Sequence, residues 1–144
     1  MTGQGQGIIR TSWAGTIAFG VATVAGVVAP DPLAWLGFAV SLALFVAGCV
    51  MFVWAFFIAV ARSRTDEIAV SNLYLLSGAP SDVRTQLFGS LAVELVVAIG
   101  TAAARPYTIA ATAILAPVYG LALCGRWSAR YGTFPPRKPT PKRK

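Results

Sequence analysis

The chain has 144 residues, of which 56% are hydrophobic and 12% are charged, whereas a soluble domain carries roughly 25% charged residues. Twelve basic and five acidic residues give a net charge of +7, and they gather near the ends and in one connection. This pattern excludes a water-soluble globule, and without a basic face on a soluble fold we expect no nucleic-acid partner.

The residue types also limit the chemistry of the chain. It contains no histidine, which excludes a histidine-ligated metal, a histidine-ligated haem and a Ser-His-Asp triad. Cys49 and Cys124 lie in apolar stretches without a CxxC motif, where a thiol behaves as a small hydrophobe. We therefore expect neither a metal nor a cofactor.

The first predicted span follows a Gly/Gln-rich leader, residues 1–11. Residues 12–29 carry no charge and would cover about 27 Å as a helix, which is enough for a thin membrane span. A cleaved signal peptide is the alternative, because Arg10 precedes the run and Val27-Val28-Ala29 resembles a cleavage site. The length of the run, and Pro30 directly after the site, favour a span.

The second predicted span, residues 33–61, begins after a Pro-Asp-Pro turn and also lacks charge. As a helix it would be about 43 Å long, more than the roughly 30 Å hydrocarbon core. We expect it to tilt or to project into the cytoplasm.

A polar connection, residues 62–86, separates the second span from the third. Within it, residues 65–76 have the composition of a short amphipathic helix with Ala69, Leu73 and Leu76 on one face. Two more apolar stretches follow, residues 87–104 and 107–124, separated by an Arg-Pro turn. Pro117 predicts a kink in the last of them. The sequence therefore predicts an all-α bundle of four transmembrane helices over residues 12–125, followed by a basic tail, residues 126–144.

The basic residues predict the orientation. Eleven of the twelve lie in the leader, the middle connection or the tail, and only Arg105 lies in a short turn. The positive-inside rule then places both termini and the middle connection in the cytoplasm. The tail bases are expected to contact anionic lipid headgroups or to serve only as topology anchors: Arg126, Arg130, Arg137, Lys138, Lys142, Arg143 and Lys144.

Small residues spaced four apart predict where the helices pack, because membrane helices associate by close approach. The first span has such a row at Ala14, Ala18, Ala22 and Gly26. Further rows are Ala39, Ala43 and Ala47 in the second span, and Thr112, Ala116, Gly120 and Cys124 in the fourth.

Glu94 is the only acidic or basic residue within a predicted span. A charged carboxylate at this depth costs about 2 to 3 kcal/mol on insertion scales. Its row, shared with Ser90, Ala98 and Ala102, points into the bundle. Two states are open: a protonated acid hydrogen-bonded to Ser41, Thr112 or Tyr119, or a carboxylate reached by water. The residue could hold a proton or cation, contact a partner subunit, or join helices of its own bundle.

Four blocks of sequence, taken in their order along the chain, carry a resemblance to a known family. They are Arg62-Ser63-Arg64-Thr65-Asp66-Glu67-Ile68, Leu76-Ser77-Gly78-Ala79-Pro80, Arg105-Pro106-Tyr107, and residues 126–137 (RWSARYGTFPPR). Over residues 35 to 137 the chain resembles a family of small actinobacterial integral membrane proteins of unassigned function. The resemblance implies four transmembrane helices, a high-GC Gram-positive source and hence a bacterial inner (plasma) membrane, and it implies no activity.

Two functions follow as hypotheses. The first is a non-enzymatic accessory or assembly subunit of a larger inner-membrane complex, since the soluble segments are too small for an active site and the spans carry small-residue faces. Its partner would be another membrane protein or further copies of itself. The alternative is a small oligomeric transporter or proton-coupled carrier that uses Glu94. An enzyme is disfavoured because no nucleophile–base pair or metal-ligand cluster is present in the sequence.

Overall fold

The computed structural model describes residue 3 and residues 5–138, and it is all-α. The elements are α1 (Gln6–Val28), α2 (Pro30–Arg62), α3 (Val70–Tyr74), α4 (Ser81–Ala104), the 3₁₀ helix η1 (Ile109–Leu115) and α5 (Pro117–Tyr131). Among the described residues, extended pairing is limited to one bridge between Asp66 and Pro136.

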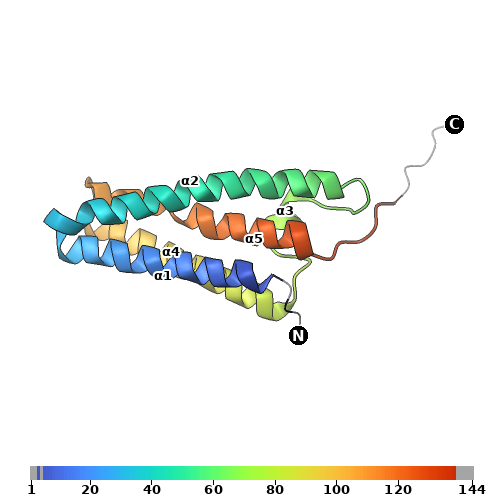
Figure 1. Cartoon of the computed structure of the whole chain (residues 1–144), viewed down its shortest axis with the longest axis horizontal. Coiled ribbons are helices and arrows are strands. Elements are labelled where there is room, and N and C mark those ends of the chain that lie inside the picture. Colours follow the sequence, from blue (N-terminus) through green and yellow to red (C-terminus); the bar gives the residue numbers. More distant parts are fainter. Residues whose placement is uncertain (1–2, 4, 139–144) are drawn as a thin grey trace.

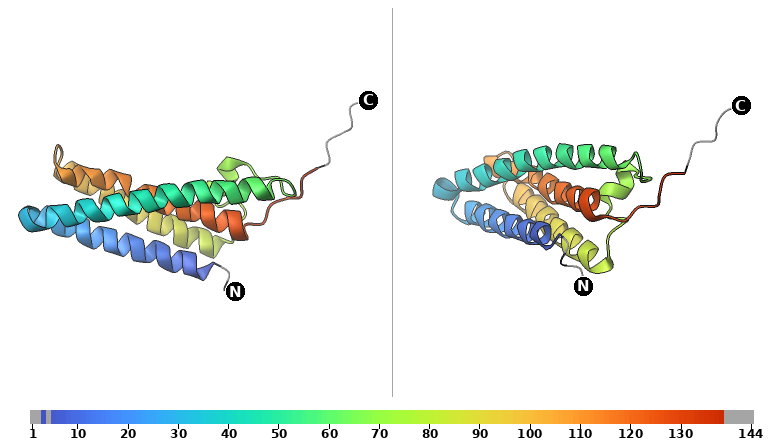
Figure 2. Two further views of the ribbon diagram at one scale, coloured as in Figure 1. Left: turned by 45° about the horizontal axis from the view of Figure 1, so that its top comes forward. Right: turned by 45° about the vertical axis from the view of Figure 1, so that its right-hand side comes forward.

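Four long helical segments lie side by side, with η1 and α5 together forming the fourth (Figure 1). The chain runs in the same direction in α1 and α4, and in the opposite direction in α2 and η1–α5. The start of α1, the α2–α3 connection and the end of α5 therefore lie at one end of the bundle, which we call the terminal end (Figures 1 and 2). The α1–α2 and α4–η1 turns lie at the other end.

The predicted four-span architecture is confirmed. The segments Gln6–Val28, Pro30–Arg62, Ser81–Ala104 and Ile109–Tyr131 are each long and apolar enough to cross a membrane. Much of the apolar surface of α2 faces outward, as expected where lipid replaces water as the solvent. Its exposed large side chains are Trp35, Leu36, Leu42, Val46, Val50, Val53, Trp54, Phe56, Phe57 and Val60. This is the architecture of a multi-pass membrane protein.

The helices extend beyond the predicted spans. Helix α1 begins at Gln6 rather than at residue 12, and α5 continues to Tyr131 rather than ending at residue 124. The extra turns at the terminal end pack onto one another: Ile8 and Ile9 of α1 contact a buried cluster that includes Trp127 of α5. Parts of the predicted leader and tail are therefore helical.

The predicted kink at Pro117 is a change of helix type. Residues Ile109–Leu115 form a 3₁₀ helix, and α5 begins with Pro117 in its first turn. Proline has no amide hydrogen and cannot donate to the carbonyl four residues before it, which is that of Ala113. The Ala113 oxygen instead accepts a hydrogen bond of 3.1 Å from the amide of Ala116.

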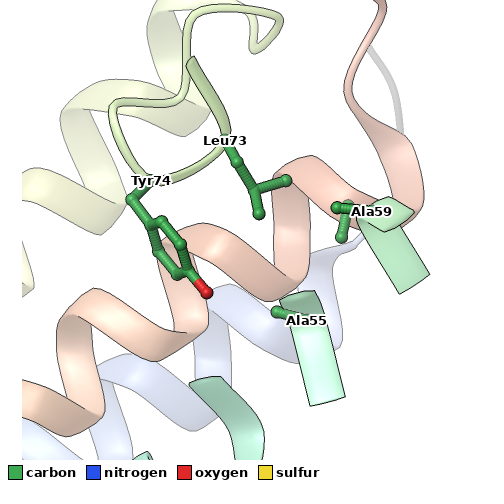
Figure 3. Packing of buried hydrophobic residues seen from close by; sticks show 5 residues of the cluster. Ala55, Ala59, Leu73 and Tyr74 are labelled. Carbon is green, nitrogen blue, oxygen red and sulfur yellow. The ribbon is translucent and has the colours of Figure 1, made fainter. Parts of the chain in front are cut away.

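The connection between α2 and α4 packs onto the bundle. Its helix, α3, covers only Val70–Tyr74, less than the expected residues 65–76. Leu73 and Tyr74 insert between α2 and α5 beside Ala55 and Ala59 (Figure 3). The Tyr74 ring stacks on that of Phe52, with centroids 4.3 Å apart and an interplanar angle of 9°. The apolar side of the connection thus closes the terminal end, while Ala69 is exposed.

Candidate intramembrane polar site

Glu94 lies in the middle of α4 and is fully buried, with 0% of its surface exposed. Ser90 and Ala98, one turn away on either side, are also fully buried. Residues four apart share one face of a helix, so the predicted inward-facing row is confirmed at these three positions. The carboxyl group therefore lies between helices of its own chain and not on the outer surface.

Helix α1 supplies the partners of this row. Thr16 Oγ1 lies 2.9 Å from Glu94 Oε1 and 2.9 Å from the Ser12 carbonyl oxygen, so these two acceptors share its one proton. The hydroxyls of Ser12 and Ser90 are joined at 2.6 Å. Because α1 and α4 run in the same direction, two pairs with a four-residue spacing face each other in register. The contacts form a polar seam of four buried side chains, Ser12, Thr16, Ser90 and Glu94.

The second carboxyl oxygen of Glu94 lies against α5. A Cβ atom at Gly120 would come within 2.6 Å of Glu94 Oε2 and 3.0 Å of Leu91 Cδ1. Gly120 thus provides the space that the carboxyl group occupies. Oε2 is buried and has no hydrogen-bond partner among the described residues, so one oxygen of the carboxyl group is satisfied and the other is not.

The hydroxyls expected to bind Glu94 lie elsewhere. Ser41 donates to the Gly37 carbonyl at 2.7 Å, and Thr112 donates to the Ile109 carbonyl at 2.6 Å. Tyr119, next to Gly120 in sequence, donates to the Thr11 carbonyl at 3.1 Å. The expected hydrogen bonds to Glu94 were therefore wrong, because none of these three hydroxyls contacts the carboxyl group and each donates to a backbone carbonyl instead.

Ser12 and Thr16 were not predicted as partners of this row. A signal for them was available, since they have the same four-residue spacing in α1 that Ser90 and Glu94 have in α4. That signal decides the pairing only when the two helices are known to be neighbours with the same direction.

The predicted packing rows are correct in part. Ala22 and Gly26 of α1, and Ala116 and Gly120 in the fourth segment, are buried. Ala14 and Ala18 are exposed. A four-residue step advances about 400° around a helix with 3.6 residues per turn, so a row drifts by about 40° at each step. The buried face of α1 follows the true period through Ser12, Gly15, Thr16, Phe19, Ala22, Thr23 and Gly26.

The basic residues of the predicted lipid-binding tail have different surroundings. Arg126 and Arg130 lie within α5; Arg126 is half-buried and Arg130 is exposed. Arg137 Nη1 donates to the Ser63 carbonyl at 2.9 Å, and Lys138 is exposed. The remaining tail bases, Lys142, Arg143 and Lys144, lie outside the described residues.

Arg62 connects α2 to the end of α5. Its guanidinium donates to the carbonyls of Ala129 at 2.8 Å and Gly132 at 3.1 Å, and to Asp66 Oδ2 at 2.8 Å. It also lies over the Phe134 ring, 5.7 Å from the centroid. Arg62 therefore satisfies carbonyls at the C-terminus of α5 that have no partner within the helix.

The polar seam can hold a proton, since it combines one carboxyl group with three hydroxyls. Among the described residues, no group of three or more His, Cys, Asp or Glu side chains lies close enough to bind a metal ion. Comparisons with protein-family models, curated proteins and solved structures find no match to this chain.

Proposed function

We propose that the protein is a non-enzymatic accessory or assembly subunit of a larger bacterial inner-membrane complex. The observation that carries the proposal is the outward position of Ala14 and Ala18 on α1, two small residues one turn apart. Ala39 and Ala43 of α2 are exposed in the same way. Small exposed residues let a second helix approach closely in lipid, where packing and not the hydrophobic effect drives association.

Glu94 takes no part in the proposed interface. An acid that joined two subunits would lie on the outer surface of the isolated chain, whereas Glu94 is enclosed by α1, α4 and α5. Its role in this proposal is to hold α1 against α4, and the outer faces of α1 and α2 provide the contacts with the partner.

The proposed complex has both termini of this chain in the cytoplasm. The positive-inside distribution of the basic residues supports this orientation. It agrees with a bundle in which Gln6 and Tyr131, the first and last helical residues, lie at the same end. An actinobacterial source rests on the sequence resemblance alone and remains a prediction.

Native purification tests the proposal. Tagged wild-type protein from its source membrane should co-isolate another membrane protein in stoichiometric amount. The Ala14→Leu/Ala18→Leu variant should co-isolate much less of that partner, because two larger side chains prevent a partner helix from approaching α1 closely. Ala92→Leu/Ala103→Leu, which makes the same substitution at two exposed alanines of α4, should retain it. A wild-type chain that purifies as a monomer or a plain homo-oligomer would contradict the proposal.

The second candidate is a small oligomeric proton-coupled carrier that uses Glu94. The observation that favours it is the second carboxyl oxygen, which is buried and has no partner among the described residues. An intramembrane acid with free hydrogen-bonding capacity is a common feature of proton relays.

Glu94→Gln separates the two functions. The amide keeps the size of the side chain and an oxygen that accepts from Thr16, but it carries no exchangeable acid proton. A carrier would lose proton flux in proteoliposomes, while an assembly subunit would keep its partner. Unchanged flux with normal expression would remove the carrier function.

A further inference from the structure

A cavity of about 430 Å³ opens at the terminal end of the bundle, between the first turns of α1 and the last turns of α5. Two arginines, Arg126 and Arg130, line it together with the polar side chains of Gln6 and Thr11. No aspartate or glutamate belongs to its described lining. The chemistry of this wall therefore favours an anion.

The two arginines are four residues apart in α5, so they share one side of that helix. Arg126 lies over the ring of Trp54, 5.8 Å from the centroid, and its Nη1 contacts Met51 Sδ at 3.6 Å. These contacts orient the guanidinium without neutralising its charge. Within residues 5–138 the one ion pair is Arg62–Asp66, so neither Arg126 nor Arg130 has a carboxylate partner there.

The same cavity has an apolar wall. Met51 of α2 and Leu123 of α5 line it on the side of the bundle. The neighbouring Trp54 is 60% exposed, and tryptophan is enriched at the level of lipid headgroups. A ligand that fits would carry a negative headgroup for the arginines and an apolar chain that follows the outer surface of α2 and α5.

We propose that this cavity binds the phosphate of an anionic phospholipid headgroup, with Arg126 and Arg130 as its ligands. Guanidinium groups suit this role because their planar N–H donors match the oxygens of a phosphate. The proposed site uses two arginines and not all the basic residues of the tail. Arg137 is not one of them, and its Nη1 donates to the Ser63 carbonyl. The proposal does not depend on the assembly function.

Native mass spectrometry of the full chain tests the site. The protein is reconstituted with phosphatidylglycerol or with phosphatidylcholine, extracted in mild detergent, and the retained lipid is counted. Wild type should retain phosphatidylglycerol in preference to phosphatidylcholine. Arg126→Gln/Arg130→Gln should retain about tenfold less phosphatidylglycerol, since each base near the headgroups adds to the attraction.

The control removes the same charge elsewhere. Arg64→Gln/Lys138→Gln changes two exposed residues that lie outside this cavity, and it should retain phosphatidylglycerol within about twofold of wild type. Equal losses in both double variants would show that only net charge matters and would overturn the proposal, as would full retention by Arg126→Gln/Arg130→Gln.

Two further measurements complete the test. If Arg126→Gln disturbs folding, the single variant Arg130→Gln is used instead, because an exposed side chain can be replaced without disturbing the fold. This variant should retain several-fold less phosphatidylglycerol than wild type. Millimolar glycerol phosphate is added as a soluble competitor. Lipid that stays bound identifies a lipid site as proposed, whereas displacement by the soluble phosphate would assign the cavity to a free phosphate ester and overturn the lipid assignment.

Discussion

At the scale of single residues, buried polar side chains of α1 and α4 satisfy one another, whereas Glu94 Oε2, Trp127 Nε1 and Ser128 Oγ are buried without a hydrogen-bond partner among the described residues. Thr16 donates to Glu94, and the hydroxyls of Ser12 and Ser90 bind each other. Where lipid is the solvent, no water can take the place of a missing hydrogen-bond partner. Such contacts therefore specify which helices pack together. The one unsatisfied oxygen of Glu94 is therefore the residue-scale feature with the clearest functional potential.

Tyr74 provides a residue-scale prediction. Its hydroxyl donates to the Phe52 carbonyl at 3.0 Å, and burial raises the pKa of the Tyr74 phenol. Only the neutral phenol can donate, so this stabilisation is present below the ordinary tyrosine pKa of about 10 and is lost as pH rises through the raised folded-state pKa.

Thermal unfolding in detergent between pH 8 and pH 11 measures the effect. The unfolding temperature of wild type should fall more steeply above pH 10 than that of Tyr74→Phe, which keeps the stacked ring without the ionisable group. Parallel curves for the two proteins would contradict the prediction.

At the scale of elements, helices approach closely where glycine removes a side chain. A Cβ atom at Gly48 of α2 would lie 2.8 Å from the Tyr119 nitrogen and 2.9 Å from its Cα. These are backbone atoms of α5 and cannot move aside as a flexible side chain would. Gly48 therefore sets the distance between α2 and α5, next to the α5 residues that lie against Glu94.

Gly48→Ala should reduce the free energy of unfolding by about 1 to 3 kcal/mol, the usual cost of overpacking. The control is Gly100→Ala in α4, where an added Cβ meets nothing within 4 Å. That change should be neutral or stabilising by up to about 1 kcal/mol, because alanine favours a helix over glycine. Unfolding by SDS in mixed micelles compares the two, and similar values for both variants would argue against the close approach.

At the scale of the whole molecule, the segment after α5 is hydrogen-bonded to the connection between α2 and α4 at the terminal end of the bundle. The amides of Thr133 and Arg137 donate to the carbonyls of Gly78 and Thr65, at 3.1 and 2.9 Å. The Glu67 amide donates to the Pro135 carbonyl at 2.8 Å. Arg62 lies at the centre of this arrangement, so one side chain joins α2, the end of α5 and the tail.

Arg62→Gln should loosen the whole terminal end. Hydrogen exchange of the Glu67, Thr133 and Arg137 amides should quicken about tenfold or more, because hydrogen bonds to charged groups contribute about 1.5 to 3 kcal/mol. Arg64→Gln, an exposed neighbour, should leave these amides protected. Hydrogen–deuterium exchange with mass spectrometry reads both variants, and unchanged protection in Arg62→Gln would refute the role of Arg62.

The sequence by itself determined that the chain is an all-α protein with four long apolar helices, and that Glu94 and Ser90 face inward. Those properties follow from the solvent preference of each residue and from the period of the helix, which act locally. It also placed Ala22, Gly26, Ala116 and Gly120 correctly in the packed interior.

Only the tertiary structure decided which groups meet. Thr16 rather than Ser41, Thr112 or Tyr119 binds Glu94, and Ala14 and Ala18 face outward, because both outcomes depend on how each helix is rotated about its axis and which neighbour it has. A row of alanines does not by itself select one rotation, since Ala14 and Ala18 are exposed while Ala22 of the same row is buried. The polar contacts of α1 with α4, and the close approach of α2 to α5 at Gly48, distinguish them, and these are relations between distant segments that no single stretch of sequence contains.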